Sequence, residues 1–480
     1  MLSRRHLMMA GAAAMAASDA QAAQSAKGFV TVRDGRLTHD GKPYRFVGAN
    51  LWYGAWLGSP GKTGDRARLG RELDRLKALG VTNLRVLGAG ERSPAKVAID
   101  PTFRGPGEDY DQDLLTGLDV LLAEMGKRGM KAVIYVNNFW DWSGGMPAYL
   151  RWTGNGDWFQ QGDPAHPWPE FADYSARFYG DAKAQALFQS YVRALVTRTN
   201  GVTGKPYRDD PTIMAWQLAN EPRPGGSEAF GVANLPTYYR WISETSAFIK
   251  GLDGRHLVTT GSEGDMGCLQ REACVVEAHR PASIDYLTLH VWPNNWGWID
   301  FKNQPASYAA GEAKCRDYIK RHIAIAKGLN KPLVIEEFGL IRDDRALTPG
   351  APAAFKDRFY GMVFDTVLAD MKAGGPIAGS NFWAWNGEGR ATHADAWFKM
   401  GDKAYAGDPP QEEQGLFGVF DADVSTLAVV REHATAVSAL RNSRTLSQRE
   451  REGPARSVGG RGVTPSPISH SALPARRPRS

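Results

Sequence analysis

Short apolar runs alternate with longer segments of helical periodicity eight times between residues 44 and 440. In residues 65–79, for example, leucines stand at positions 69, 73, 76 and 79, the spacing of one helix face. The apolar runs predict strands at residues 44–50, 83–87, 131–135, 213–219, 257–260, 284–289, 332–335 and 380–383. Helices are predicted at residues 65–79, 113–128, 182–198, 238–252, around 275, and at 312–327, 355–372 and 427–440. This alternation favours parallel strands joined by helices.

Eight such units predict an α/β fold, a (β/α)₈ TIM barrel occupying residues 28–442. The alternative, an open doubly wound sheet, is less favoured because no glycine-rich dinucleotide or phosphate loop opens any predicted helix. Asp-Gly pairs at residues 34–35 and 40–41 predict a short N-terminal β-hairpin. Polar and aromatic stretches at residues 137–180 and 386–415 predict extended loops at the catalytic face, where the carboxyl ends of the strands meet.

The first residues have the features of an export signal rather than of a folded domain. Arg4 and Arg5 precede a weakly apolar run, and residues 20–22 offer an A-x-A cleavage site. We therefore expect residues 1–23 to be removed and the protein to be periplasmic or extracellular. The paired arginines resemble a twin-arginine signal, but an ordinary secretory signal stays open. No apolar run reaches the ~18 residues of a membrane span, so no membrane is expected as a partner.

The net charge of +6 is concentrated in the last residues. Residues 443–480 contain eight arginines and two glutamates, so they account for the whole excess and leave the rest of the chain neutral. A neutral domain predicts no basic groove and no nucleic-acid partner. Because this segment is rich in Arg, Ser, Pro and Gly and poor in large apolar residues, we expect a disordered basic tail.

Three cysteines are present, and two of them are close in sequence. Cys268 and Cys274 are able to close a small loop in an oxidising compartment, which leaves Cys315 unpaired, but their spacing alone does not prove a disulfide. There is no zinc-binding spacing, no H-E-x-x-H motif and no acidic calcium loop. The sequence therefore predicts no metal site and no cofactor.

Two glutamates stand where predicted strands end. Glu221 follows the fourth strand, which Pro222 cannot extend because it has no amide hydrogen, and Glu337 lies where the seventh strand continues to Gly339. Retaining glycosidases need one protonated carboxyl group and one ionised carboxylate about 5–5.5 Å apart. Since 116 residues separate the two glutamates, they meet only if their strands converge, as they do at a barrel mouth.

Further strand ends carry side chains that suit a sugar-cleaving site. Asn220 is able to bond the 2-hydroxyl of a sugar, and Arg85 to keep a neighbouring carboxylate ionised. His290 ends the sixth strand and is able to orient a carboxylate, and Trp383 at the eighth strand offers a floor for a sugar ring. Further tryptophans are candidate sugar platforms, each equally consistent with core packing: Trp140, Trp142, Trp296, Trp298 and Trp385.

These residues together resemble glycoside hydrolase family 5, and most closely its endo-β-1,4-mannanases, over about residues 29–440. The resemblance rests on Asn-Glu-Pro at residues 220–222, Glu-Phe-Gly at 337–339, the run at 198–216 and the tryptophan-rich run at 290–298. It implies that Glu221 is the acid/base and Glu337 the nucleophile of a retaining enzyme. Glu336 is expected to point the other way by strand alternation.

The same resemblance implies that Arg85, Asn220, His290 and Trp383 surround the reacting sugar. One position departs from the family pattern. Many members have a tyrosine two residues after the histidine, in contact with the nucleophile, and here that residue is Trp292. An indole N–H is still able to donate a hydrogen bond, but it cannot act as a phenol.

The implied partner is a β-mannan polysaccharide or manno-oligosaccharide, cut by a monomer. Three alternatives remain open at this point. The first is another β-glycanase of the cellulase type. The second is an exo-β-mannosidase in which the loops at residues 137–180 and 386–415 block one end of the cleft. The third is a carbohydrate-binding protein without catalysis.

Overall fold

The computed structural model describes the backbone of residues 27–452 and the side chains of residues 27–441. Its centre is a sheet of eight parallel strands in the order β8-β7-β6-β5-β4-β11-β10-β9. These are β4 (Phe46–Asn50), β5 (Asn83–Leu87), β6 (Lys131–Tyr135), β7 (Ile213–Gln217), β8 (Leu257–Thr259), β9 (Leu287–Val291), β10 (Leu333–Phe338) and β11 (Ile377–Phe382). A parallel bridge between Thr259 and Tyr286 links the two ends of this order. The predicted (β/α)₈ barrel is therefore confirmed.

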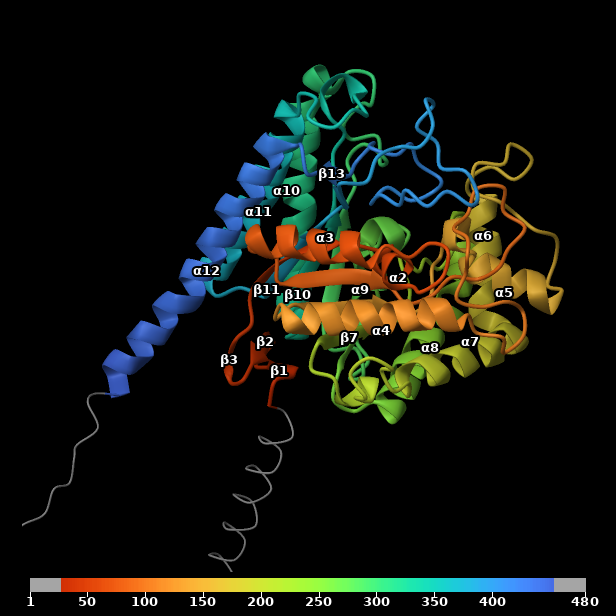
Figure 1. Ribbon diagram of the computed structural model, residues 1–480, viewed down its shortest axis with the longest axis horizontal. Coiled ribbons are helices and arrows are strands. Elements are labelled where there is room, and N and C mark those ends of the chain that lie inside the picture. The colour runs from red at the N-terminus through yellow and green to blue at the C-terminus, as the bar shows by residue number, and fades with distance from the viewer. Residues whose placement is uncertain (1–26, 453–480) are drawn as a thin grey trace, which may run out of the picture. The chain divides into compact units, whose positions relative to one another are not determined.

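Helices connect and cover these strands (Figure 1). They are α3 (Arg66–Ala78), α4 (Gln112–Lys127), α7 (Ala182–Val196), α8 (Glu228–Leu252), α9 (Glu272–His279), α10 (Gln304–Leu329), α11 (Ala354–Ala373) and α12 (Val424–Glu452). Two begin earlier than the sequence predicted, because polar caps lie upstream of the apolar periodicity. The side chain of Ser227 caps α8 by accepting a hydrogen bond from the amide of Phe230, and that of Asn303 caps α10 by accepting one from the amide of Ala306.

The chain ends differ from the predictions in part. The first turns form two hairpins rather than one, and they join β1 (Val30–Arg33), β2 (Arg36–His39) and β3 (Lys42–Pro43). Val30 and Leu37 pack with Phe46 and Val334, so this small sheet contributes to a buried cluster with the barrel strands. Helix α12 includes residues 443–452, which the sequence assigned to the basic tail. The predicted export signal and residues 453–480 lie outside the described residues.

The two predicted long loops follow the carboxyl ends of β6 and β11. The first holds η1 (Asp141–Ser143), α5 (Gly145–Thr153), α6 (Glu170–Ala176) and η2 (Arg177–Gly180). The second contains β12 (Trp385–Gly387) and leads to β13 (Val419–Phe420). The remaining short helices are α2 (Gly54–Gly58), η3 (Tyr207–Asp209), η4 (Asp265–Gly267) and η5 (Asp343–Arg345). Both loops therefore extend the face at which the sequence placed the chemistry.

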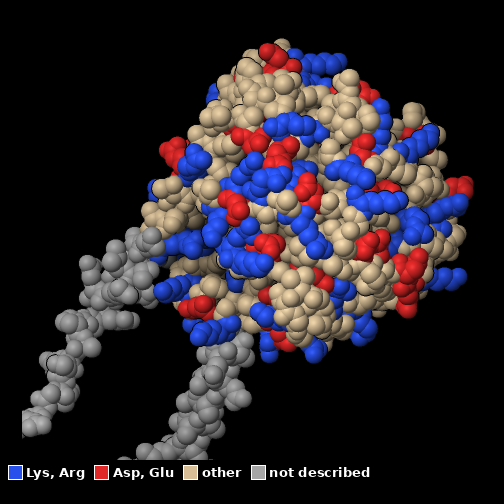
Figure 2. Space-filling model, in the orientation of Figure 1, with Lys and Arg blue, Asp and Glu red and all other residues tan. Residues whose placement is uncertain are grey.

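Charged side chains of both signs lie on the surface (Figure 2), and two of the three cysteines are bonded to each other. Figure 2 shows basic and acidic side chains interspersed on the visible face, as expected of a neutral domain. Cys268 and Cys274 form a disulfide, which the sequence alone left open, and Cys315 is a buried free thiol. Within the described residues, no helix combines the length and the apolar character that a membrane span requires.

Candidate active site

The barrel mouth brings together the two glutamates that the sequence singled out. Glu221 lies just beyond β7, and Glu337 lies in β10, where it pairs in register with His290 of β9. One oxygen of each glutamate and one ring nitrogen of His290 lie within 4.8 Å of one another. This closeness is nearer to the roughly 5–5.5 Å between the carboxyl groups of retaining glycosidases than to the roughly 6.5–9.5 Å of inverting ones.

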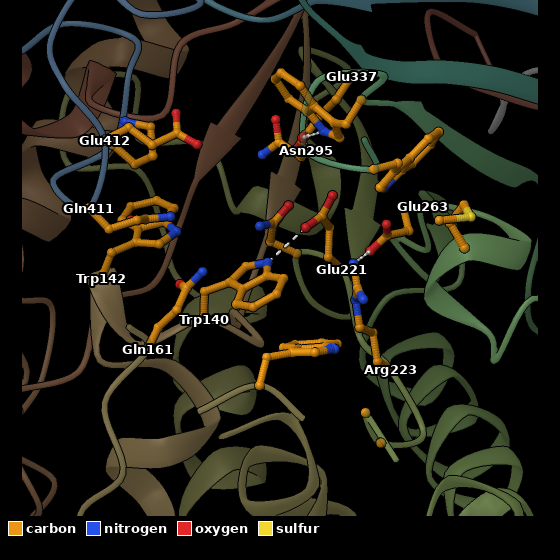
Figure 3. Close-up of a pocket in the computed structure, with 18 of the residues that line it drawn as sticks. Trp140, Trp142, Gln161, Glu221, Arg223, Glu263, Asn295, Glu337, Gln411 and Glu412 are labelled. Atoms are coloured by element: carbon orange, nitrogen blue, oxygen red, sulfur yellow. Dashed lines mark hydrogen bonds and ion pairs between the residues drawn. The ribbon is translucent and has the colours of Figure 1, made fainter. Parts of the chain in front are cut away.

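Glu221 is held from both of its oxygens. Its Oε1 atom is 2.7 Å from His290 Nδ1, and its Oε2 atom accepts a hydrogen bond of 2.7 Å from the indole of Trp140. The backbone of Glu221 has a φ of +49°, a left-handed conformation that is costly for a residue with a side chain. Because the chain turns sharply here, the carboxylate points across the mouth of the barrel (Figure 3).

Glu337 is held by a different set of donors. Its Oε1 atom forms a buried ion pair with Arg85, and its Oε2 atom accepts a hydrogen bond of 3.2 Å from the indole of Trp292. His290 Nδ1 lies 3.3 Å from the same Oε2 atom. The predicted pairing of Arg85 with this carboxylate is confirmed, and the indole N–H of Trp292 donates to it as the sequence allowed.

Arg85 also orients the amide of Asn220. Its Nη2 atom donates to the Oδ1 atom of Asn220 at 2.7 Å, and its Nε atom donates to Gln217 at 2.8 Å. The amide nitrogen of Asn220 donates one hydrogen to Asn138 at 3.1 Å, which leaves its second hydrogen available. Tyr135 lies against the guanidinium of Arg85 at 4.5 Å. Sequence reasoning missed Gln217 and Tyr135, which end β7 and β6, and Asn138 in the loop after β6, because residue type and position alone do not show which side chains contact Arg85 and Asn220.

Glu336, next to the candidate nucleophile, points away from the mouth as strand alternation predicted. It is fully buried, does not line the cleft, and is hydrogen-bonded by Gln217 inside the barrel. Its Oε2 atom lies 3.5 Å from Arg85 Nε. The barrel interior therefore holds one more carboxyl group beside the candidate pair.

The charges and hydrogen bonds of this cluster favour a proton on His290, as its pKa shows. Burial lowers the pKa of His290, but the charge of Glu337 and the hydrogen bond with Glu221 outweigh it and raise that pKa to about 10. Burial raises the pKa of Glu221, but the hydrogen bond and charge of His290 reverse this and lower it to about 2. Burial raises the pKa of Glu337, against the opposing charges of His290 and Arg85.

Glu221, His290 and Glu337 are close enough together to be considered as metal ligands. A metal requires a deprotonated imidazole, and the raised pKa of His290 favours a proton in that place. The donor set therefore suits proton chemistry better than metal binding.

Glu221 and Glu337 line a cleft of about 600 Å³. Five of the predicted aromatic side chains line it: Trp140, Trp142, Trp292, Trp296 and Trp383. The prediction for Trp385 is wrong, because its ring is buried and its N–H donates to Glu72 at 2.9 Å in the core. Trp298 does not line the cleft either, since it packs against Trp296 and Tyr318.

A family model described as GH family 5 beta-mannosidase-like matches residues 27–442. The chain belongs to glycoside hydrolase family 5. A family 5 mannosidase from Rhizomucor miehei superposes with a TM-score of 0.78 at 33% identity, covering 87% of this chain and 99% of that one. An endo-1,4-beta-mannanase from the same organism, at a TM-score of 0.62 and 23% identity, covers 86% and 99% and supports the fold.

Curated relatives of this family 5 chain include plant enzymes. Mannan endo-1,4-beta-mannosidase 4 of Oryza sativa subsp. japonica is 31% identical over 296 residues, which cover 59% of this chain and 58% of the relative. Mannan endo-1,4-beta-mannosidase 3 of the same plant matches at 31% identity and also over 58% of its length. The chain therefore spans a little under three fifths of these two relatives.

The family 5 site also contains side chains that sequence reasoning missed. Arg223 lies 5.3 Å from the ring of Trp140 and 5.2 Å from that of Trp168, and it pairs with Glu263 at 2.5 Å. Burial raises the pKa of Glu263 to about 7. The position of Arg223 directly after Pro222 was the available signal, whereas Trp168 gave none among the fifteen tryptophans.

On the opposite side of the glutamates lie Gln161, Gln411 and Glu412, again unforeseen (Figure 3). They come from the two long loops, Gln161 from the first and the other two from the second. Burial raises the pKa of Glu412 well above its ordinary value, and the neighbouring carboxylates raise it further. This shift favours the protonated form of Glu412, which is able to donate a hydrogen bond.

Proposed function

We propose that the protein is a retaining glycoside hydrolase that cleaves β-1,4-mannosidic bonds by double displacement. The observation that carries this proposal is the closeness of the Glu221 and Glu337 carboxylates at the barrel mouth, whose oxygens lie too near each other for the wide separation of an inverting pair. Cellulase-type action is the weaker alternative, because the similar proteins bear mannosidase or mannanase names. A carbohydrate-binding protein without catalysis is disfavoured because both carboxylates and Asn220 are present and in contact with donors.

The two glutamates have separate roles in the proposed reaction. Glu337 attacks the anomeric carbon while Glu221 protonates the departing glycosidic oxygen, which gives a covalent mannosyl-enzyme. Glu221 then takes a proton from water, and the water oxygen displaces Glu337 from the sugar. Two inversions at one carbon retain the configuration. The free hydrogen of the Asn220 amide is offered to the 2-hydroxyl of the sugar.

His290 supplies the proton that Glu221 needs. Its Nδ1 atom is 2.7 Å from Glu221, and the charge of Glu337 is the strongest of the influences that raise its pKa. When Glu337 bonds to the sugar, that negative charge disappears and the imidazolium becomes more acidic. The proton is therefore released toward Glu221 at the step in which the leaving oxygen requires it.

Mannose as the sugar is supported by the relatives rather than by a particular contact. A variant of the Rhizomucor miehei family 5 mannosidase was solved with mannosyl-fructose. We propose mannan, glucomannan, galactomannan or manno-oligosaccharides as substrates. Hydrolysis of a mannan should release reducing sugar, and the variants Glu337→Ala and Glu221→Ala should lose it. Activity on carboxymethylcellulose in place of mannan would refute the choice of sugar.

An exo-acting β-mannosidase is the second candidate, and the cleft wall favours it. The aglycone lies on the side of the acid/base, which here is the side of Arg223 and Glu263 (Figure 3). The glycone side is lined by Gln161, Gln411 and Glu412. We infer that these side chains close that end behind one terminal sugar, since a longer glycone would have to pass through them.

The polar atoms of this wall suit the hydroxyls of a chain end. Within residues 27–441, the Oε1 atoms of Gln161 and Gln411 and the Oε2 atom of Glu412 are buried without a hydrogen-bond partner. Buried polar atoms of this kind are costly unless a ligand or water satisfies them. The terminal hydroxyls of a non-reducing mannose offer both donors and acceptors.

Products from mannohexaose labelled at its reducing end distinguish the two modes. Exo action releases mannose and leaves labelled chains that shorten one unit at a time. Endo action gives labelled dimers and trimers from the start. In an exo enzyme, Glu412→Ala should gain internal products, whereas a wild-type pattern that is already internal would refute exo action.

We further propose that residues 1–23 direct export, that residues 28–442 form the catalytic domain, and that it acts as a monomer outside the cytoplasm. The support is the arginine pair, the A-x-A site and the Cys268–Cys274 disulfide, which suits an oxidising compartment. Residues 443–480 are proposed to take no part in catalysis. The N-terminal sequence of the mature protein, together with its mass in solution, tests the cleavage site and the monomer.

A further inference from the structure

The backbone of residues 415–418 is held by a buried carboxylate. Asp408 is fully buried, and its Oδ1 atom accepts hydrogen bonds from the amides of Phe417 at 2.8 Å and Gly418 at 2.9 Å. Its Oδ2 atom accepts from the amide of Gly415 at 2.8 Å and from the Asn386 side chain at 3.0 Å. Four N–H donors thus converge on one side chain.

The carbonyl groups of the same segment are held by two buried basic side chains. Arg342 donates to the carbonyl of Gly415 at 2.6 Å and to that of Gly418 at 2.7 Å. Lys356 donates to the carbonyl of Phe417 at 2.5 Å and to that of Gly418 at 2.9 Å. Charge-assisted hydrogen bonds to both sides of a short backbone leave it little freedom.

Two parts of the active site are attached to this segment. The ring of Phe417 packs edge-on against Trp292, with centroids 5.0 Å apart, and Trp292 in turn donates to Glu337. The loop between Asp408 and Gly415 carries Glu412 on the cleft wall. The hydrogen bond from Gly415 to Asp408 closes this loop at its base.

We propose that Asp408 is a positioning residue that fixes, through one buried carboxylate, both the Trp292 donor to Glu337 and the Glu412 wall of the glycone subsite. Asp408 touches neither the substrate nor the reacting atoms and acts through residues 415–418. The inference rests on the proposed function, because its catalytic readouts need β-mannosidase activity. One residue outside the cleft would then determine both the orientation of Glu337 and the number of sugars that fit on the glycone side.

The variant Asp408→Asn tests this directly. Its amide keeps the shape of the side chain, but its NH₂ group meets amide donors where the carboxylate accepted them. We expect kcat on an aryl β-mannoside to fall about tenfold to a hundredfold, since a displacement of about 1 Å at the chemistry costs that much. We also expect a changed pH profile of kcat and new internal products from mannohexaose.

A matched control lies at the far end of the barrel. Asp119 is also fully buried and accepts four hydrogen bonds, from Arg198, Tyr207 and the amide of Gly201. Those partners belong to the segment before β7, away from the cleft. Asp119→Asn should lower the unfolding temperature comparably and leave the pH profile and the product pattern of the wild type.

If Asp408→Asn does not fold, the variant Lys356→Met tests the positioning role of residues 415–418 instead. Burial lowers the pKa of Lys356 to about 7, so a methionine of similar length removes a poorly solvated amine while it releases the Phe417 and Gly418 carbonyls. It should change the pH profile and the products in the same direction as Asp408→Asn.

The outcomes separate the two proposals. A folded Asp408→Asn or Lys356→Met with the wild-type pH profile and products would overturn the positioning role while leaving the β-mannosidase intact. The same changes in Asp119→Asn would also overturn it, because any loss of stability would then produce them. A wild-type protein inactive on every β-mannoside would instead refute the proposed function.

Discussion

The indole of Trp292 donates its N–H to the Oε2 atom of Glu337 at 3.2 Å. The residue is almost fully buried, and Trp383 and Phe417 pack against its ring at 5.8 and 5.0 Å. Because two aromatic neighbours fix the plane of the ring, the N–H has one direction available. A tryptophan therefore provides the hydrogen bond to the candidate nucleophile at a position where a phenol is common in family 5.

Trp292→Phe should remove this bond and keep most of the packing. A hydrogen bond to a charged group contributes about 1.5–3 kcal/mol, so we expect kcat to fall roughly tenfold to a hundredfold with little change in KM. Steady-state kinetics on an aryl β-mannoside measure the effect. Trp296→Phe is the control, since its ring lines the same cleft but packs against Trp298 and Tyr318. Equal losses in both variants would contradict the specific role of the Trp292 N–H.

Sodium azide should distinguish the two glutamates. In Glu337→Ala the azide takes the place of the nucleophile, and one displacement gives an α-mannosyl azide from an aryl β-mannoside. In Glu221→Ala the azide attacks the covalent intermediate, and two displacements give the β-mannosyl azide. NMR of the products reads the configuration. The opposite assignment of α and β products would exchange the roles of the two residues.

His290→Asn should move the basic limb of the pH profile. The pKa of His290 is raised to about 10, so the wild-type site keeps its proton as the pH rises toward that value. Without the imidazole the proton has to reside on a carboxyl group, whose ordinary pKa is about 4.3, and is lost at lower pH. The loss of kcat/KM with rising pH should therefore begin at lower pH in the variant. An unchanged basic limb would exclude His290 as the store of the proton.

His279 should make the fold sensitive to acid. It is fully buried, its Nδ1 atom is 2.7 Å from the Val275 carbonyl, and its Nε2 atom is 2.8 Å from the Thr260 hydroxyl, which suits a neutral ring. Burial lowers its pKa from 6.5 to about 4. The unfolded chain therefore binds more protons between these values, and stability present above pH 6.5 is lost as the pH falls toward 4.

The size of this effect follows from the shift, and a single variant isolates it. About 3 kcal/mol of unfolding free energy should disappear by pH 4. His279→Gln cannot take up that proton, so the stability gap between wild type and variant should narrow by about this amount from pH 7 to pH 4. Urea unfolding at several pH values measures the gap. A gap that stays constant with pH would show that His279 does not titrate in this range.

Much of the fold and of the reacting group was predictable because it follows from local patterns. Each strand and helix of the barrel has its own periodicity, so the alternation was visible without knowledge of contacts. Glu221 and Glu337 stood out as candidates because each lies near a strand end, Glu221 directly before Pro222 and Glu337 two residues before Gly339. The starts of α8 and α10 were placed late, because their caps at Ser227 and Asn303 precede the apolar spacing on which the prediction relied.

The sequence by itself determined the barrel and the neutral charge of the domain, and it singled out Glu221 and Glu337 as candidates, since these depend on residue types and their order along the chain. Only the tertiary structure decided which tryptophans face the cleft. Trp385 is bonded to Glu72 in the core, whereas Trp168 reaches the cleft beside Arg223. The tertiary structure also placed Glu412 at the cleft, beside Gln161 and Gln411. The physical reason is that burial and hydrogen-bond partners are set by segments distant in the chain, which no local pattern records.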